Sequence, residues 1–197
     1  MGKRVRRVPY QLNPAEEKLS FEELKAILRG ADELIATGGR NMLAKILKGS
    51  RDKKLLELEL DQCPVYGYYK HLTLPEITAR IDRAIVDGYL KIEYSYRLPV
   101  LVFTEKGWEI EKETYADELL EKLTGLLEVM DYSFVKELKD RNREMILLLL
   151  EKIEATGDRR FIPLLHAWAF IEYKKVRKAI NRVINSLKSK HHNRSVN

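Results

Sequence analysis

The sequence predicts a mainly α-helical protein with one small β-hairpin and a helical bundle after it. Apolar residues recur every three or four positions through most of the 197 residues, which is the spacing of one helix face. Between Tyr89 and Thr104 the period changes to two, with β-branched and aromatic residues, as in paired strands. After Trp108 the helical period returns, so the hairpin lies between two helical regions.

Residues 1–20 are predicted to form a flexible basic arm. Basic side chains open the segment and prolines interrupt it: Lys3, Arg4, Arg6, Arg7, Pro9 and Pro14. Ser20 and Glu23 have the spacing of a capping box, in which each side chain accepts the other residue's backbone N–H. A helix is therefore expected to begin after Ser20 and to end near Arg29.

Two more helices are expected before the next capping box. Gly38 and Gly39 break the chain, and the apolar residues of the stretch from Arg40 to Lys48 share one helix face. Ser50 is placed to cap the following helix, which has a basic first turn.

The next helix begins at a second capping box, formed by Thr73 and Glu76, and Gly88 ends it. The hairpin follows, with its turn expected near Arg97-Leu98-Pro99. Helices followed by a two-stranded wing predict a winged-helix domain over residues 21–115.

The rest of the chain is predicted to be a helical domain over residues 116–188 and a basic tail over residues 189–197. Its helices are expected at about 115–130, at 134–154 with a break near Asp140, and at 161–187.

Three short motifs of the winged-helix region carry a family resemblance. They are Leu47-Lys48-Gly49-Ser50, Val65-Tyr66-Gly67 and Ile85-Val86-Asp87-Gly88-Tyr89-Leu90. In this order and spacing they resemble the Leu-Arg-Gly-Ser turn, the aromatic-Gly turn and the helix end before the wing in the RQC domain of RecQ helicases. The resemblance implies a nucleic-acid-binding winged helix. In the members of this family that open duplexes, an aromatic residue at the tip of a long wing stacks on the terminal base pair.

The C-terminal half resembles a HEAT-type helical repeat between Leu147 and Ala179. A proline, Pro163, begins or bends one helix, and a Val-Arg-x-Ala pattern at Val176 packs the next. Little more than one repeat is covered, so this half is expected to pack on the winged helix or on itself as a small bundle.

The sequence lacks two parts of a RecQ enzyme. It has no Gly-rich Lys-Ser/Thr phosphate loop, and its one cysteine, Cys63, cannot form a four-cysteine zinc module. The histidines share no spacing with cysteine or carboxylates that would indicate a metal site. We therefore expect a stand-alone, non-enzymatic relative of the domain that needs no cofactor.

The net charge of +6 favours an anionic partner. The charge is unevenly distributed, with seven basic and four acidic side chains in residues 1–30, thirteen and fourteen in residues 31–115, and sixteen and twelve in residues 116–197. Non-specific DNA affinity follows the number of phosphates neutralised. The near-neutral winged helix must therefore bind through local clusters of charge.

The first candidate cluster is the turn at Lys48, Gly49 and Ser50. A glycine lets the backbone approach a phosphate, and the N-terminus of the following helix offers N–H groups. Arg51 and Lys54 add charge around the same place. The alternative is a tight turn with solvated charges, and the family resemblance favours phosphate contact.

The second candidate cluster is the wing, with Tyr94, Tyr96 and Arg97 near its tip. Tyr96 is the nearest candidate for the stacking residue, and stacking on a base contributes about 1 to 3 kcal/mol. The alternative is that Tyr94 packs under the sheet and Tyr96 is ordinary hairpin surface. The hairpin also looks short for strand separation.

The helix before the hairpin offers Arg80 and Arg83 on its polar side. Asp82 and Asp87 share that neighbourhood and repel phosphates. We therefore expect backbone and end recognition rather than insertion of this helix into the major groove.

The last helix is a second basic surface. If Val176 and Ile180 face the core, helical geometry places Lys174, Lys178 and Arg182 on or near the opposite face. This surface either tracks a phosphate backbone or is a solvated helix at the end of a chain.

These features predict a protein that binds structured DNA, such as a duplex end, fork or junction. The alternatives are a protein-interaction adaptor, with a partner on the helical half, and a binder of structured RNA. The sequence has neither a secretory signal nor an apolar run of membrane-spanning length, and a lone cysteine fits a reducing compartment. We therefore expect a cytoplasmic protein with no membrane partner.

Overall fold

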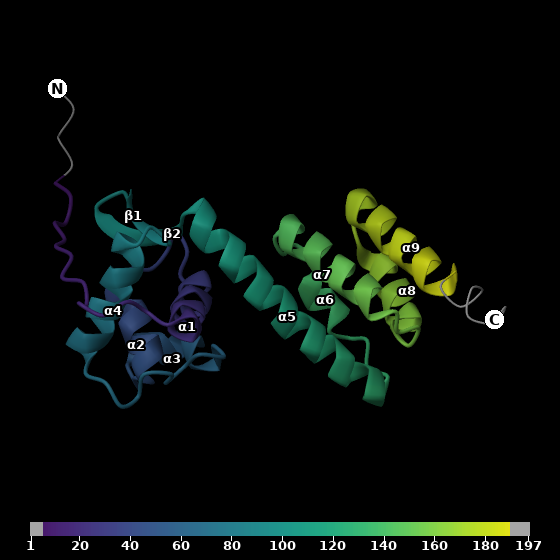
Figure 1. Cartoon of the computed structure of the whole chain (residues 1–197), viewed down its shortest axis with the longest axis horizontal. Helices are drawn as coiled ribbons and strands as arrows, with labels where there is room; N and C mark the ends of the chain where they lie inside the picture. Colours follow the sequence, from purple (N-terminus) through teal and green to yellow (C-terminus); the bar gives the residue numbers. More distant parts are fainter. Residues whose placement is uncertain (1–5, 190–197) are drawn as a thin grey trace, which may run out of the picture. The chain divides into compact units, whose positions relative to one another are not determined.

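The computed structural model describes residues 6–189, which belong to two compact units (Figure 1). The first unit ends at Glu111 and the second begins at Lys112, inside the long helix α5 (Glu105–Val129). The division lies close to the boundary expected near residue 115. Each unit has buried apolar residues of its own.

The first unit is a winged helix with a leading helix. Its elements are α1 (Phe21–Asp32), α2 (Arg40–Lys48), α3 (Lys53–Glu57), the 3₁₀ helix η1 (Leu60–Gln62), α4 (Leu74–Val86), β1 (Leu90–Ser95) and β2 (Leu98–Phe103). The antiparallel pair of β1 and β2 is the only sheet in the described residues. The predicted fold class, mainly helical with one hairpin, is confirmed.

Both predicted capping boxes are present. Ser20 Oγ accepts the N–H of Glu23, and the Glu23 carboxylate accepts the N–H of Ser20. Thr73 and Glu76 exchange the same two hydrogen bonds at the start of α4. The first helix continues past its expected end to Asp32, because its last turns are buried in the core.

The prediction that Ser50 caps the next helix is wrong. Asp52 is the N-cap of α3, and its carboxylate accepts the N–H of Lys54 at 3.1 Å. Ser50 Oγ instead accepts the N–H of Asp52 at 3.2 Å. The helix begins later than expected because the chain leaves the left-handed turn at Gly49 through a short non-helical stretch.

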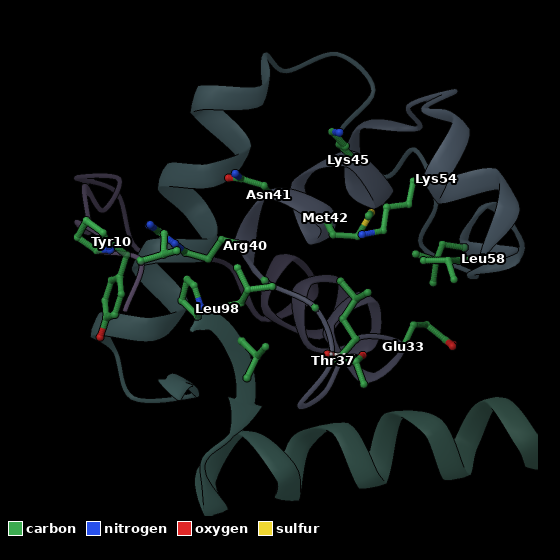
Figure 2. Close-up of a pocket in the computed structure, with 18 of the residues that line it drawn as sticks. Tyr10, Glu33, Thr37, Arg40, Asn41, Met42, Lys45, Lys54, Leu58 and Leu98 are labelled. Atoms are coloured by element: carbon green, nitrogen blue, oxygen red, sulfur yellow. Dashed lines mark hydrogen bonds between the residues drawn. The ribbon is translucent and has the colours of Figure 1, made fainter. Parts of the chain in front are cut away.

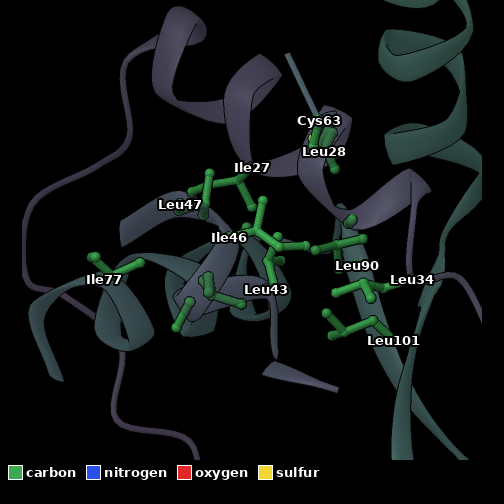
Figure 3. Packing of buried hydrophobic residues seen from close by; sticks show 14 of the residues in the cluster. Ile27, Leu28, Leu34, Leu43, Ile46, Leu47, Cys63, Ile77, Leu90 and Leu101 are labelled. Carbon is green, nitrogen blue, oxygen red and sulfur yellow. The ribbon is translucent and has the colours of Figure 1, made fainter. Parts of the chain in front are cut away.

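The core of the first unit consists of aliphatic side chains from the helices and both strands. Figure 3 shows where they meet: Ile27 and Leu28 of α1, Leu43, Ile46 and Leu47 of α2, Ile77 of α4, and Leu90 and Leu101 of the hairpin. Each of these residues is at most 1% exposed. Burial on this scale contributes about 1.5 to 3 kcal/mol per side chain, which offsets the conformational entropy lost on folding.

Two of the family-like motifs meet at a contact between glycines. Gly49 ends α2 with a left-handed backbone at φ 75°, and a Cβ on it would lie 3.1 Å from Gly67 Cα. The N–H of Gly67 donates to Ile46 O at 2.9 Å, and the N–H of Tyr69 donates to Leu47 O at 2.8 Å. Only glycine accommodates both the dihedral angle and the close approach without strain. These motifs therefore build the fold.

The wing is a hairpin with six residues in each strand. Ser95 pairs with Leu98, so Tyr96 and Arg97 form a two-residue turn. The turn lies earlier than expected, because Leu98 and Pro99 pair with β1 instead of turning. Tyr96 has a left-handed backbone at φ 55°, which holds its side chain at the tip.

The described part of the arm lies beside the hairpin and α4 (Figure 1). Its backbone N–H groups donate at three points: Val8 to Arg97 O at 2.9 Å, Asn13 to the Asp82 carboxylate at 2.8 Å, and Ala15 to Ala79 O at 2.9 Å. The sequence predicted a flexible arm, but from residue 6 onward the arm is held against the winged helix.

The second unit contains the rest of α5 and the helices α6 (Val135–Leu138), α7 (Arg143–Thr156), α8 (Phe161–Ile171) and α9 (Lys174–Ser189). In this unit α9 packs on both α7 and α8. Asp140 has φ 69°, so the break predicted near it is confirmed. The HEAT-like character of the unit stays a prediction, and residues 190–197 of the expected basic tail lie outside the described residues.

Two expected helices of this half have other limits. The helix expected from about residue 115 already begins at Glu105, where Thr104 Oγ1 accepts the N–H of Gly107. The helix expected over 161–187 is divided at Glu172, which has an extended backbone. The buried Glu172 carboxylate accepts the indole N–H of Trp168 at 3.2 Å and the N–H of Tyr173 at 3.0 Å.

We predict that Gly49→Ala destabilises the protein more than Gly88→Ala does. Both glycines have a left-handed backbone, and the added Cβ alone costs about 1 to 2 kcal/mol there. A Cβ on Gly88 meets nothing within 4 Å, whereas one on Gly49 also presses on Gly67, which adds roughly 1 to 3 kcal/mol. Urea unfolding measures both losses, and equal losses would contradict the packing role of the glycine contact.

Candidate nucleic-acid interface

The residues of the first candidate cluster have separate roles in the structure. Lys48 Nζ donates to the carbonyl oxygens of Lys70 and Leu72, both at 2.7 Å. These two bonds fasten the end of α2 to the chain that leads into α4. The Lys48 ammonium group is therefore engaged within the protein.

The anion site expected at the start of α3 is occupied by a carboxylate of the protein itself. Asp52 caps this helix, and Lys45 Nζ lies 2.7 Å from Asp52 Oδ2. The hydrogen bond from Lys45 lowers the pKa of Asp52, so this group is negative at neutral pH. The structure therefore does not bring Lys48, Ser50 and Lys54 together around one anion. Lys48 binds two backbone carbonyls, Ser50 Oγ accepts the N–H of Asp52, and the Asp52 carboxylate caps the helix that carries Lys54.

Arg51 and Lys54 are exposed, and Lys54 lies at a pocket of about 1000 Å³ (Figure 2). The pocket is bounded by the arm, the start of α2, the α3 region and β2. Figure 2 shows Lys54 and Leu58 on one side and Tyr10 and Leu98 on the other. The sequence did not indicate this pocket, because its walls come from four separate segments of the chain.

The arginines of α4 are paired within the protein. Arg80 Nε lies 3.3 Å from Glu23 Oε1, and Arg83 Nη2 lies 2.6 Å from Asp87 Oδ1. Both arginines are half-buried, and the arm binds the same helix at Asp82. The α4 surface therefore offers little unpaired positive charge to a DNA groove.

At the wing, Tyr96 is 75% exposed. Tyr94 faces the arm instead, because its hydroxyl donates to Val8 O at 2.8 Å. Arg97 is exposed, and its Nε donates to Arg6 O at 3.0 Å. The wing thus presents one aromatic ring and one guanidinium group at its tip, while Tyr94 contacts the arm, which neither of the two interpretations of Tyr94 anticipated.

The basic surface of the last helix is present in the structure. Lys174, Lys178 and Arg182 are exposed on α9, while Val176 and Ile180 are buried, as the helical spacing predicted. The other core residues of this face are Val183, Ile184 and Leu187.

The structure also joins the arm, which was in no candidate cluster, to Tyr94 of the wing and to Asp82 of α4. The Arg7 guanidinium carbon lies 4.8 Å from the centre of the Tyr94 ring. Asp82 is 1% exposed, and its carboxylate accepts hydrogen bonds from Arg40 and from the N–H of Asn13. The basic composition of the arm was the only available signal, and it carries no information about where the arm lies.

Within residues 6–189, no group of three or more His, Cys, Asp or Glu side chains is placed to hold a metal ion. Cys63 is buried and forms no disulfide. The same part of the chain has no helix with the length and apolar character that crossing a membrane requires.

We predict that Lys48→Met lowers stability, whereas Lys54→Met does not. The first change removes two hydrogen bonds from an ammonium group and leaves two carbonyls without that donor, which costs about 1 to 3 kcal/mol. The second removes an exposed charge. Chemical unfolding of both variants measures the difference, and a Lys48 variant as stable as the Lys54 variant would contradict the structural role.

Comparisons with known proteins agree with this architecture. The family model of the RQC domain matches residues 18–119. The ATP-dependent DNA helicase RecQ of Bacillus subtilis (strain 168) is 32% identical over 74 residues, which are 38% of this chain and 12% of that protein. No solved structure matches the chain significantly. The winged helix, its glycine turns and the family match over about half of the chain together show that this protein belongs to the RQC domain family.

Proposed function

We propose that this protein binds structured DNA, at duplex ends, forks or junctions, without catalysing a reaction. The RQC domain is associated with DNA binding in RecQ helicases. The chain covers only 12% of the RecQ helicase it resembles, and its 197 residues contain no phosphate loop for ATP. Binding without a motor activity is therefore the function that these residues support.

The exposed ring of Tyr96 is the observation that carries this proposal. It lies in the two-residue turn of the wing, with a left-handed backbone and with 75% of the residue exposed. Leu98, the first residue after the turn, is 62% exposed and adds an apolar contact surface. A ring at the tip of a hairpin stacks on a base only where the base is accessible, as at a duplex end or a fork.

The surroundings of α4 support end recognition over groove reading. A recognition helix needs donors that are free to contact base edges or phosphates. Arg80 and Arg83 are instead paired with carboxylates, and the arm binds the helix at Ala79 and Asp82.

The exposed basic face of α9 supports backbone contacts from the second unit. Lys174, Lys178 and Arg182 lie along one side of the helix, and no acidic residue follows Glu172 in the sequence. Such a row of charges binds phosphates independently of base sequence.

Two further features extend the proposal. The thiol of Cys63 is buried and forms no disulfide, which suits a reducing compartment, and on that ground we propose a cytoplasmic location. DNA is favoured over RNA because the related helicase acts on DNA, and the phosphate contacts themselves suit either polymer.

A protein-interaction adaptor is the second candidate function, and the pocket of Figure 2 favours it. Met42, Leu58 and Leu98 give the pocket apolar walls. Phe170, at 87% exposure, and Tyr173, at 61%, offer apolar surface on the second unit. Large apolar side chains in such positions are common at protein interfaces.

A binding comparison separates these functions. Fluorescence anisotropy with blunt duplex, forked DNA, single-stranded DNA and hairpin RNA, each at two salt concentrations, measures affinity and its salt dependence. We expect forked and blunt duplex to bind most tightly. An adaptor would bind all four ligands no better than an unrelated basic protein of similar charge.

We predict that Tyr96→Ala weakens binding to forks and duplex ends while binding to internal duplex stays nearly unchanged. The stacking that this change removes contributes about 1 to 3 kcal/mol, which is roughly fivefold to 150-fold in affinity. Competition between forked DNA and a closed circular duplex measures this preference. An equal loss for both ligands would reject end recognition by the wing.

We predict that changing Lys174, Lys178 and Arg182 together to Glu weakens every nucleic-acid ligand by a similar factor. Each phosphate that the protein no longer neutralises reduces the slope of log affinity against log salt by about 0.9 for duplex DNA. The matched control replaces three other exposed basic residues of the same unit by Glu, which changes the net charge by the same amount: Lys136, Arg143 and Arg159. Equal losses of affinity in the two variants would show that overall charge, and not the face of α9, binds the backbone.

A further inference from the structure

The arm and the wing are joined at the tip of the hairpin by three hydrogen bonds. The N–H of Val8 donates to Arg97 O at 2.9 Å, and Arg97 Nε donates to Arg6 O at 3.0 Å. The Tyr94 hydroxyl donates to Val8 O at 2.8 Å. The arm therefore lies alongside the hairpin, next to the turn that carries Tyr96.

Contacts with aromatic rings also hold this part of the arm, at Arg7 and Tyr10. The Arg7 guanidinium lies over Tyr94, whose ring centre is 6.1 Å from that of Tyr10. Tyr10 in turn lies below the guanidinium of Arg40, with 5.8 Å between the guanidinium carbon and the ring centre. Arg40 is bound to the buried Asp82 carboxylate. This series of contacts connects the arm to the core of the winged helix.

The result is a cluster of positive charge next to an exposed ring. Arg6, Arg7 and Arg97 are all exposed, and the arm is hydrogen-bonded to the wing tip at this point. The nearest carboxylate on the hairpin, Glu93, alternates to the face opposite Tyr94 and is paired with Lys91 at 2.7 Å. The carboxylate of the hairpin therefore does not share the face on which Tyr94 meets the arm.

We propose that Arg6 and Arg7 of the arm, together with Arg97, form a phosphate-binding surface that grips the nucleic-acid backbone beside the base on which Tyr96 stacks. This inference rests on the proposed function and assigns the arm to the binding site. It also explains how a nearly neutral winged helix binds a polyanion, because the charge comes from a segment outside the domain's helices and strands. The ligand is a phosphodiester backbone, of DNA or of RNA.

The fixed position of the arm has an energetic consequence. A flexible basic tail loses conformational entropy when it binds, and this loss subtracts from the affinity. Here the arm is held before any ligand arrives, by hydrogen bonds at Val8 and Asn13. The guanidinium groups that this main chain carries also suit two-point contacts with phosphate.

The test is a charge reversal in the full chain, Arg6→Glu with Arg7→Glu. Both side chains are exposed, and the arm's hydrogen bonds here are made by its main chain, so the fold is expected to persist. Loss of the Arg7–Tyr94 ring contact is expected to lower the free energy of unfolding by at most about 1 kcal/mol. Affinity for forked DNA and for hairpin RNA is measured by anisotropy across a salt series. We expect a roughly tenfold to hundredfold loss at 0.1 M salt and a salt slope that is shallower by about two phosphates.

Two control variants make the result specific. Lys18→Glu with Lys70→Glu changes the net charge equally at exposed positions away from the wing tip, and its affinity is expected to fall much less. Arg6→Lys with Arg7→Lys keeps the charge and is expected to retain the salt slope. A loss with forked DNA alone, and not with hairpin RNA, would assign the surface to DNA.

The outcomes separate this inference from the proposed function. If the unaltered protein binds no nucleic acid above the background of a basic protein, both are overturned. If the unaltered protein binds, and Tyr96→Ala removes the preference for ends, but the arm variant behaves like the Lys18 and Lys70 control, only the role of the arm is overturned. A selective loss in the arm variant, with the slope retained by the lysine variant, supports it.

Discussion

The buried carboxylate of Asp82 is the group on which the arrangement of the winged helix most depends. A charged carboxylate away from water is strongly unfavourable unless partners compensate it. Here Arg40 at the start of α2 and the backbone N–H of Asn13 in the arm supply the compensation. One side chain of α4 thereby fixes the start of α2 and the path of the arm. The arm in turn crosses α4, reaches the wing and determines which surfaces stay open.

The short motifs that identify the family have a structural role in this protein. Gly49 and Gly67 let two turns approach each other, and Lys48 binds two backbone carbonyls next to them. Their residues hold α2 against the chain that enters α4. A match to these motifs therefore indicates the fold, and the binding surface that we propose lies on less patterned residues of the arm, the wing tip and α9.

Positive charge is used in two ways along this chain. Within the winged helix, Arg40, Lys45 and Arg83 are each within 2.7 Å of a carboxylate oxygen, and the first of them binds the buried Asp82. At the edges, the arginines of the arm and the basic residues of α9 remain exposed. The near-neutral total of the winged helix therefore includes charges that are already paired within it, and it says little about how strongly the whole chain attracts an anion.

The sequence by itself determined those features whose partners lie within a few residues. Both capping boxes and the α9 face, in which Val176 and Lys178 lie on opposite sides, follow from contacts between neighbouring residues. The hairpin followed from its period of two, although its turn was placed too late in the chain. Only the tertiary structure decided that Lys48 binds backbone carbonyls of the protein itself and that the buried Asp82 binds both Arg40 and the arm. It also decided that the arm lies on the wing. The physical reason is that these partners are far apart in the sequence. Asn13 binds Asp82 and Val8 binds Tyr94, with several helices between them along the chain. No local sequence pattern indicates which distant segment will supply the hydrogen-bond partner of a buried carboxylate or of a tyrosine hydroxyl.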